Sequence, residues 1–229
     1  MSLNTNTLNL IELEYDISLP PKSVIVIRVT GMGMRKLFGK EGLANNDNRE
    51  AMYQAVIETA KMMDNFIVAY QHSNEVSFVL TDDIKESTQP WLGNNFQGLI
   101  SQTTSCLSAN YSILLSSYKD QLKIGIFRAK TFELYPGAEI GDYINNRINL
   151  GVGRYISELY SKHLTGSNVS LAEAQKLLLA KGIEIKKEYM YGDIIAKPGL
   201  NYIRISPVDI GLQQINEFVE NIITNKRNG

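Results

Sequence analysis

Two β-rich runs that are almost adjacent in the chain constrain its fold most strongly. Residues 66–70 and 75–80 are rich in valine, isoleucine and aromatic side chains, and only a few residues separate them. Runs at this spacing are typical of a β-hairpin, because a two-residue turn is enough to join antiparallel strands. The pattern predicts a hairpin with Ser73 and Asn74 at its tip.

The segments around this hairpin extend it into a larger α+β pattern. An apolar run that begins at Val24 ends at Thr30, as a buried strand does when it delivers a residue to the edge of a sheet. Gly31 and Gly33 follow and indicate a turn. Helical and β-like patterns then alternate in the split β-α-β-β-α-β order. The expected elements are strand 22–30, helix 48–63, hairpin 66–81, helix 94–118 and strand 123–134.

The two ends of the chain carry different patterns. Residues 1–21 alternate polar and apolar side chains and end in two prolines, which predicts an extended arm that could bind a neighbouring subunit. Residues 140–160 carry an amphipathic helical stripe, typical of core or subunit packing. Ser170 and Glu173 predict a capping box at the start of a further helix. Residues 183–205 contain short β-like runs, and a terminal helix follows.

These patterns divide the chain into an arm over residues 1–21, a sheet domain over 22–138 and a helical region over 139–229. The sequence contains no internal repeat, low-complexity tract or linker that would separate the last two parts. We therefore expect the helical region to pack on the sheet domain and to form one structural unit with it.

Composition excludes several classes of protein. The formal net charge is −1, so the chain has no global positive field of the kind used for nonspecific nucleic-acid binding. One cysteine, Cys106, excludes an intramolecular disulfide, and two histidines are too few for a histidine-rich metal site. The sequence shows no leader pattern and no apolar run of membrane-spanning length. We expect a cytoplasmic protein that has no membrane partner.

Several short motifs together resemble the tRNA-His guanylyltransferase family. In that family the first strand ends in Arg-apolar-Asp-Gly-Arg, and the hairpin carries Gln-Ser-Asp-Glu. The resemblance covers roughly residues 22–197. The segments that carry it here are Arg28-Val29-Thr30-Gly31, Asn46-Asp47-Asn48-Arg49, His72-Ser73-Asn74-Glu75, Tyr135-Pro136, Asp142-Tyr143-Ile144 and Arg147.

This resemblance implies a polymerase-palm-like fold for residues 22–138 with an appended helical region. It also implies an ancestral activity, the transfer of guanylate to a tRNA end in the direction opposite to normal polymerisation. That activity uses a triphosphate donor and two magnesium ions held by two aspartates, in the general two-metal arrangement.

The positions of the two metal-binding aspartates are occupied here by Thr30 and Asn74. Neutral oxygens bind magnesium poorly, because protein magnesium sites normally use one or two carboxylates together with substrate phosphates. Glu75 is the only candidate metal ligand left in this neighbourhood. Asp82 and Asp83 follow the hairpin strand and are expected to lie farther away.

The residues that hold the nucleotide in the family are altered as well. Met32 replaces the arginine of the first signature, and a gapless count from Trp91 places Asn94, Asn95 and Gly98 where the resemblance implies cationic side chains for the triphosphate. Ser73 matches a family serine, and it could bind a phosphate or ribose or simply stabilise the turn. The positions implied for nucleotide binding are Gly31, Met32, Gly33, Ser73, Asn95 and Gly98.

Two further motifs also fit a purely structural role. Asp47 and Arg49 retain the family pattern but also fit a helix cap with a surface pair. Asp142, Tyr143 and Arg147 have helical spacing that could tie the sheet domain to the helical region through a buried charge pair.

Three hypotheses follow. The first is a guanylyltransferase-like pseudoenzyme that has lost two-metal transfer and acts by binding a nucleotide, RNA such as tRNA, or a protein, so that the chain needs no resident cofactor. The second is an active enzyme that uses Mg²⁺ and GTP with relocated carboxylates, namely Glu75 with Asp82 or Asp83. The third is an oligomeric scaffold with a closed cleft, and a homo-oligomer is expected under the first hypothesis too.

Overall fold

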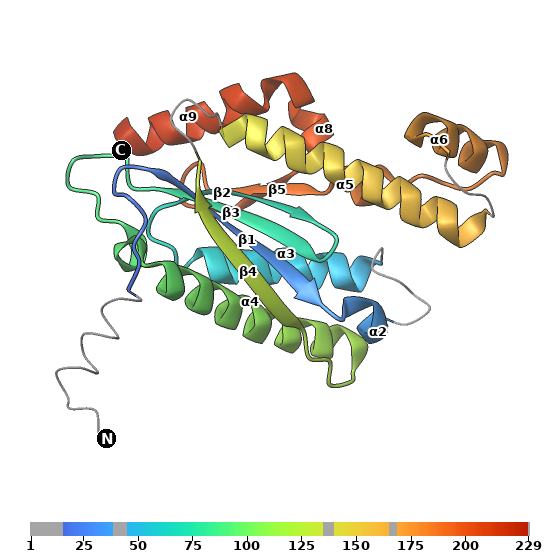
Figure 1. Cartoon of the computed structure of the whole chain (residues 1–229), viewed down its shortest axis with the longest axis horizontal. Helices are drawn as coiled ribbons and strands as arrows, with labels where there is room; N and C mark the ends of the chain where they lie inside the picture. Colours follow the sequence, from blue (N-terminus) through green and yellow to red (C-terminus); the bar gives the residue numbers. More distant parts are fainter. Residues whose placement is uncertain (1–15, 39–44, 135–139, 165–168, 229) are drawn as a thin grey trace, which may run out of the picture.

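An antiparallel sheet forms the centre of the computed structural model, which describes residues 16–38, 45–134, 140–164 and 169–228 (Figure 1). Its strands lie in the order β4-β1-β3-β2-β5-β6. They are β1 (Val24–Met32), β2 (Phe66–His72), β3 (Glu75–Thr81), β4 (Ile126–Glu133), β5 (Asp193–Ala196) and β6 (Ile203–Ile205). The predicted hairpin is confirmed, since β2 and β3 pair from Tyr70 opposite Ser77 to His72 opposite Glu75.

Helices cover both faces of this sheet (Figure 1). On one face lie α3 (Asn46–Ala60) and α4 (Phe96–Lys119), and on the other lie α5 (Ile140–His163) and α9 (Ile215–Asn228). The β-α-β-β-α-β order predicted from the sequence is therefore confirmed. The shorter elements are α2 (Met34–Phe38), a 3₁₀ turn at Trp91–Asn94, α6 (Leu171–Ala180), α7 (Lys187–Tyr191), α8 (Pro207–Ile210) and a 3₁₀ turn at Leu212–Gln214.

Because side chains alternate along β1, this strand contributes residues to the hydrophobic cores on both faces of the sheet. Ile25, Ile27 and Val29 point to the α3–α4 face and belong to its core cluster. Val26 points to the opposite face, under α5 and α9, where Arg28 follows two residues later. Because side chains alternate between faces, the α5 face changes from apolar to polar along the strand, whereas the α3–α4 face stays apolar.

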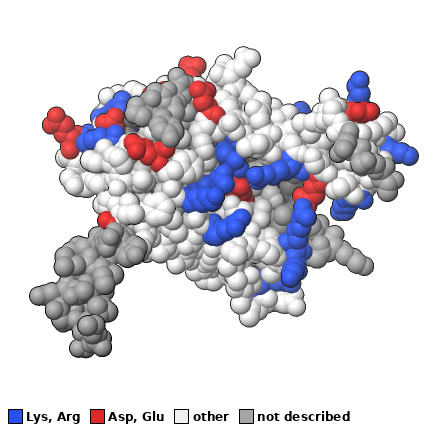
Figure 2. Space-filling model, in the orientation of Figure 1, with Lys and Arg blue, Asp and Glu red and all other residues white. Residues whose placement is uncertain are grey.

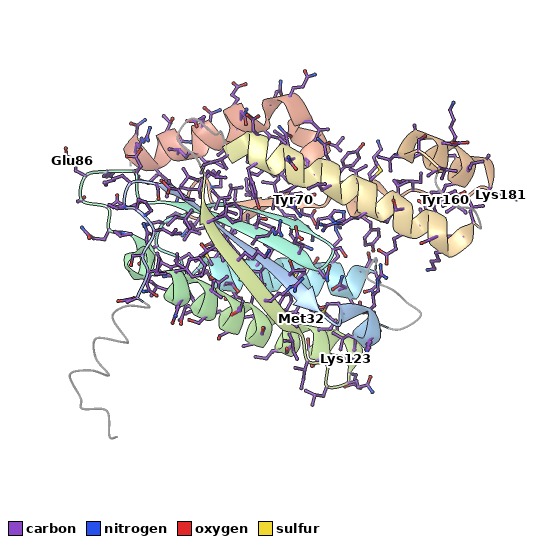
Figure 3. All side chains as sticks on the ribbon, viewed as in Figure 1. Met32, Tyr70, Glu86, Lys123, Tyr160 and Lys181 are labelled. Atoms are coloured by element: carbon purple, nitrogen blue, oxygen red, sulfur yellow. The ribbon has the colours of Figure 1, made fainter. Side chains whose placement is uncertain are left out.

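Burial of large apolar side chains holds the layers together. Ile27, Phe78 and Leu107 are fully buried between the sheet and α3–α4, and each contributes about 1.5–3 kcal/mol. Tyr70 lies between the sheet and α5 (Figure 3) and donates its hydroxyl to the Tyr191 carbonyl at 2.9 Å. Burial raises the pKa of this tyrosine, so the hydroxyl stays protonated as a donor.

The C-terminal region differs from the expected pattern in two respects. The short β-like runs expected within residues 183–205 are confirmed as β5 and β6, but the same segment also contains a helix that was not expected, α7 (Lys187–Tyr191). β5 then pairs with β2, and β6 pairs with β5, so this region extends the central sheet as well as covering it. The predicted capping of α6 is confirmed, because the Ser170 hydroxyl accepts from the Glu173 amide at 3.3 Å.

Part of the expected N-terminal arm lies outside the described residues. The part that is described runs along the start of α4, where Ser18 forms a bridge with Asn95 and the Leu19 amide donates to the Asn94 carbonyl at 2.9 Å. The arm therefore contacts the α3–α4 layer of its own chain.

Candidate functional site

The end of β1 and the tip of the β2–β3 hairpin lie side by side, as the sequence predicts. Thr30 pairs with Glu75 in the β1–β3 register. The Gly31 amide donates to the Asn74 carbonyl at 2.8 Å, and the Asn74 side-chain amide donates to the Gly31 carbonyl at 3.1 Å. Ser73 takes the left-handed backbone conformation at the tip, with φ of 55°. Asn74 is thus a structural bridge between strand end and hairpin.

Glu75 is a buried carboxylate held between two guanidinium groups from α5. Arg147 forms a buried ion pair with one carboxylate oxygen, and Arg154 contacts the other at 3.2 Å. A divalent cation at the same carboxylate would lie within a few ångströms of both arginines, where like charges repel strongly. The expected buried charge pair between the helical region and the sheet is present, and it is formed by Arg147 and Glu75. The Glu75 carboxylate is therefore already paired.

Asp82 and Asp83 cannot complete a metal site with Glu75. Glu75 is the first residue of β3 and the two aspartates follow its last residue, so about 20 Å of strand separates them. The Asp82 carboxylate accepts from the Lys22 amide at 2.9 Å and the Ser23 amide at 3.3 Å. The predicted relocated pair of Glu75 with either aspartate is therefore wrong.

The side chains at the strand end do not fit a pair of magnesium ions. Thr30 offers a neutral hydroxyl, Asn74 commits its amide nitrogen to Gly31, and Glu75 is neutralised by arginine. Across the ranges that the structure describes, no group of three or more His, Cys, Asp or Glu lies together as a metal site requires. Magnesium in proteins normally takes at least one free carboxylate.

A pocket of about 720 Å³ opens beside the hairpin tip. Its walls are the β1–α2 turn, the start of α3, the hairpin tip, the C-terminal half of α5, and α7 with the start of β5. Three of the residues implied for nucleotide binding line it, namely Gly31, Gly33 and Ser73. The volume is in the range of sites for small molecules and cofactors.

The other implied nucleotide-binding residues lie outside this pocket. Asn95 is the N-cap of α4, where its side-chain oxygen accepts from the Gly98 amide at 2.7 Å. That helix start lies beside the segment leading into β1, at the end of the strand opposite to the hairpin tip. Met32 is half exposed at the last position of β1 (Figure 3). The structure therefore separates Asn95 and Gly98 from Ser73, whereas Met32 lies between the pocket residues Gly31 and Gly33 without lining the pocket itself.

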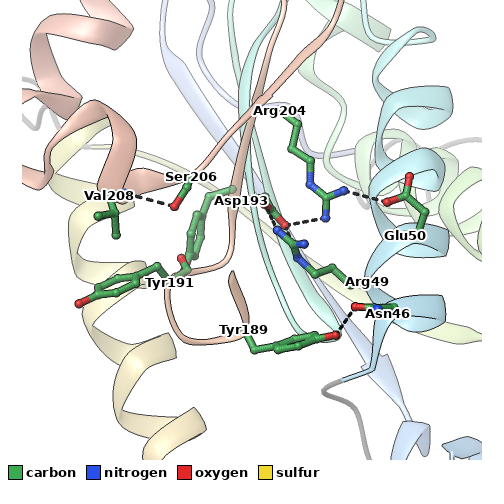
Figure 4. Close-up of polar contacts among 10 residues, drawn as sticks. Asn46, Arg49, Glu50, Tyr189, Tyr191, Asp193, Arg204, Ser206 and Val208 are labelled. Atoms are coloured by element: carbon green, nitrogen blue, oxygen red, sulfur yellow. Dashed lines mark hydrogen bonds and ion pairs between the residues drawn. The ribbon is translucent and has the colours of Figure 1, made fainter. Parts of the chain in front are cut away.

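The α3 side of the pocket contains a second buried carboxylate, Asp193. Arg49 contacts its two oxygens at 2.6 and 3.1 Å, and Arg204 contacts one of them at 3.0 Å (Figure 4). Arg204 also donates to Glu50 at 2.8 Å and lies over the Tyr53 ring, 4.4 Å from its centroid. This cluster joins α3, β5 and β6.

The cap expected at Asp47, with Arg49 as its surface pair, is wrong. The N-cap of α3 is Asn45, whose side-chain oxygen accepts from the Asn48 amide at 2.8 Å. Asp47 instead pairs with Lys119 at 2.8 Å, and Arg49 points to Asp193.

Two buried polar atoms beside the pocket have no hydrogen-bond partner in the described part of the chain. They are Oε1 of Gln71 and Nε2 of His72, at the end of β2. Burial lowers the pKa of His72, and backbone contacts with Met190 and Tyr189 offset this only in part. The ring is therefore neutral at neutral pH. Because an unpaired buried polar group costs about 1–3 kcal/mol, a ligand that pairs with either atom gains free energy.

Cationic side chains line the more exposed part of the pocket. Arg154 comes from α5 with its side chain 58% exposed, and Arg35 and Lys36 come from α2. Arg35 contacts Glu158 at 3.5 Å in an exposed ion pair, which is weak in water. The pocket thus combines a buried polar wall with an exposed cationic wall, an arrangement that suits a ligand with a polar ring system and a negatively charged group.

The sequence analysis predicted some residues of this site and missed others. It predicted that the end of β1 and the hairpin tip meet, and it named Ser73 and Glu75. It missed Asp193, although an aspartate directly after Gly192 at the start of an apolar β-like run is unusual and could have marked a buried carboxylate. It also missed Arg154, whose position on α5 becomes meaningful only beside Glu75.

Comparisons with known proteins agree with the resemblance. The model of a protein family described as tRNAHis guanylyltransferase (Thg1) matches residues 8–135, more than half of the chain. Among curated proteins, none matches the sequence. The structure is similar to a bacterial tRNA(His) guanylyltransferase (Thg1)-like protein in complex with ATP, with a TM-score of 0.85, 20% identity and coverage of 95% of this chain and 98% of that one.

Two further solved structures share the fold. A bacterial Thg1-like protein in complex with GTP aligns with a TM-score of 0.75 and 18% identity, over 93% of this chain and 98% of that one. The tRNA(His) guanylyltransferase from Saccharomyces cerevisiae aligns with a TM-score of 0.65 and 16% identity, over 86% and 93%. At these identities the likeness concerns the fold, and the palm-like α+β architecture expected for the chain is confirmed.

Proposed function

The chain belongs to the tRNA-His guanylyltransferase family, and from that premise we propose that it is a nucleotide-binding member that has lost two-metal nucleotidyl transfer. The observation that carries this proposal is the environment of Glu75. Its two oxygens face Arg147 and Arg154, while Thr30 and Asn74 stand where the resemblance implies aspartates. No free carboxylate remains at the strand end among the described residues.

The ligand class is supported by the pocket and by the relatives. Two structures with the same fold are complexes with ATP and with GTP. In this chain Gln71 and His72 line the pocket, and each carries a buried polar atom without a partner among the described residues, which supports a ligand with polar atoms such as a base or a ribose. Arg154 and Lys36 would contact the phosphates, since guanidinium and ammonium groups bind phosphate oxygens through charge-assisted hydrogen bonds.

The same residues explain why transfer is not expected. Two-metal transfer uses one ion to activate the attacking hydroxyl and both ions to neutralise charge on the phosphates. The residues present do not fit these ions, and no histidine or carboxylate at the strand end replaces the activating role, because Glu75 is paired and His72 is buried. Such a chain would bind and orient a nucleotide, while the described side chains at the strand end include no group free to take the proton from an incoming hydroxyl.

The remaining expectations stay proposals of the same kind. A tRNA or protein partner fits the family and the pocket, and a homo-oligomer fits the apolar side chains exposed on α4 and ahead of β4, Ile113, Leu122 and Ile124. No described helix combines the length and apolar character needed to cross a bilayer. The active alternative with Mg²⁺ and GTP would need metal ligands other than the side chains at the strand end.

Titration calorimetry with ATP and GTP tests this proposal, in EDTA and again in magnesium. We expect either nucleotide to bind in EDTA, and magnesium to give no gain in affinity. A parallel assay should show no incorporation of labelled GTP into tRNA in magnesium. Tight binding only in magnesium, or labelled tRNA, would contradict the loss of two-metal transfer, and no binding of either nucleotide would contradict nucleotide binding itself.

A further inference from the structure

Three consecutive residues just before α4 take a left-handed backbone conformation. Leu92 has φ of 53° and ψ of 29°, Gly93 has φ of 60° and ψ of 22°, and Asn94 has φ of 55°. Glycine adopts these angles freely and asparagine tolerates them, but in leucine they bring Cβ too close to a carbonyl oxygen. Most of the backbone strain in this turn therefore lies at Leu92.

The described part of the N-terminal arm holds this turn in place. The Leu19 amide donates to the Asn94 carbonyl at 2.9 Å, and the Asn94 side chain donates to the Pro20 carbonyl at 3.1 Å. At the first residue of α4, the Phe96 amide donates to the Ile17 carbonyl at 2.8 Å. A strained backbone persists only where its surroundings fix it, and here the arm supplies these contacts.

Few apolar contacts fasten this segment, residues 17–20, which we call the strap. Three of its four side chains are exposed, only Leu19 packs against the α3–α4 core, and none is charged. Figure 2 shows lysine and arginine side chains gathered at the centre of the view, away from the left side where the described chain begins. Elements with few buried apolar contacts open locally at a small cost in free energy, so the strap is suited to detach.

The root of the strap is fixed more firmly than the strap itself. The Asp82 carboxylate accepts from the amides of Lys22 and Ser23 at 2.9 and 3.3 Å, where β1 begins. Pro21, whose ring fixes its φ angle, lies between this anchor and the strap. The strap can therefore detach from α4 while β1 stays in place.

We propose that the strap and the turn 92–94 form one two-state element. While the strap is bound, the turn is held left-handed; when the strap detaches, the turn relaxes and the start of α4 loosens. Strain at Leu92 favours the detached state, and the hydrogen bonds to the strap oppose it. A partner that binds the detached arm shifts this equilibrium by the difference between its affinities for the two states, so the element links the arm to α4.

Amide hydrogen exchange of the full chain, resolved by NMR, tests the strain first. The amides of Leu19 and Phe96 are bonded across the contact between strap and turn, so their exchange measures detachment of the strap. Leu92→Gly and Leu92→Ala remove nearly the same side chain, but only alanine keeps the close contact of Cβ. We expect both amides to exchange about five-fold faster in L92A than in L92G.

The matched control uses Leu200, an exposed leucine whose backbone is not left-handed. The glycine and alanine variants at this position should leave the exchange of the Leu19 and Phe96 amides at the wild-type rate. Equal exchange rates in L92G and L92A would overturn the stored strain.

The reciprocal test changes the strap and observes the turn. Leu19→Pro removes the amide donor to Asn94, and the amides bonded inside the turn, those of Gly93 and Asn95, should then exchange about ten-fold faster. Acrylamide quenching of Trp91 should rise in parallel, because this buried side chain, the only tryptophan of the chain, directly precedes the turn.

Ile17→Ser is the control for the strap, since it changes an exposed side chain and keeps the backbone contacts; it should match the wild type. Circular dichroism checks that each variant folds. If Leu19→Pro does not, Asn94→Gly replaces it, because glycine accepts the left-handed angles and removes only the bond to Pro20. Exchange of the Gly93 and Asn95 amides that stays at the wild-type rate would mean that the strap merely lies on the turn, and it overturns the proposal.

Discussion

Two buried carboxylates, Glu75 and Asp193, stand on opposite faces of the sheet at the same end of the molecule, and each faces two arginines. The arginines of Asp193 come from α3 and β6 and are largely buried. The arginines of Glu75 both come from α5, and one of them, Arg154, is more than half exposed.

The two clusters differ in the balance between their arginines and their carboxylates. Around Asp193, Arg204 also contacts Glu50, so positive and negative groups balance. Around Glu75, one carboxylate faces two arginines. Arg28 on β1 and Arg128 and Lys130 on β4 add further positive charge on the same face of the sheet. We infer that the Asp193 cluster mainly stabilises the fold, whereas the surplus positive charge near Glu75 serves a ligand. Four substitutions test this contrast.

The largest effect is expected for Asp193→Asn. This change leaves Arg49 and Arg204 beside a neutral side chain in a buried site, and breaking a buried pair in this way costs about 3–5 kcal/mol. Urea denaturation measures the loss. The matched control is Glu50→Gln, which removes the exposed partner of Arg204 and should cost less than about 1 kcal/mol. Equal losses in the two variants would contradict a special role for Asp193.

Glu75→Gln should destabilise the fold less and leave nucleotide binding intact. Arg147 remains buried without its carboxylate, but the second partner, Arg154, can turn to solvent, so we expect a loss of about 2–3 kcal/mol. Since the substitution removes a negative charge beside Arg147 and Arg154, nucleotide affinity in EDTA should stay equal or rise. If affinity in magnesium collapses while affinity in EDTA does not, Glu75 is a metal ligand after all.

The predictability of this fold from sequence follows the separation of the contacts along the chain. The β2–β3 hairpin and the helices around it depend on local alternation and periodicity, so the hairpin bounds were predicted correctly and the helix ends to within three residues. The addition of β5 to β2 depends on pairing between Val68 and Ala196, far apart in sequence, which no local pattern encodes. The short helix α7 was missed because Lys187–Tyr191 contains two tyrosines that favour strands by propensity.

The site was harder to predict for the same reason. The meeting of Thr30 with the hairpin tip follows from the strand order, but the state of Glu75 depends on Arg147 and Arg154 from a helix more than seventy residues away. A sequence can show that two aspartates are missing. Only the packing of α5 on the sheet shows that the remaining carboxylate is neutralised.

Arg154→Ala should separate binding from stability. The side chain is more than half exposed, so its removal should cost less than about 1 kcal/mol of folding stability. Nucleotide affinity should fall about ten-fold, because one charge-assisted contact to phosphate is lost. Lys162→Ala, an exposed cation farther along α5 that does not line the pocket, is the control for calorimetry and denaturation. A loss of stability without a loss of affinity would assign Arg154 to the Glu75 cluster alone.

The smallest effect concerns pH and His72. Burial lowers the pKa of this histidine below the unfolded value of about 6.5, so in that range the unfolded chain binds a proton that the folded chain does not. The free energy of unfolding therefore keeps the full contribution of the neutral His72 ring above about pH 6.5, and this contribution is lost as the pH falls toward the pKa of the folded state. Urea denaturation between pH 7.5 and 5.5 should show a steeper loss in the wild type than in His72→Gln. The exposed His163, changed to Gln, is the control and should retain the wild-type slope; if it abolishes the slope instead, the buried ring is not the group that titrates.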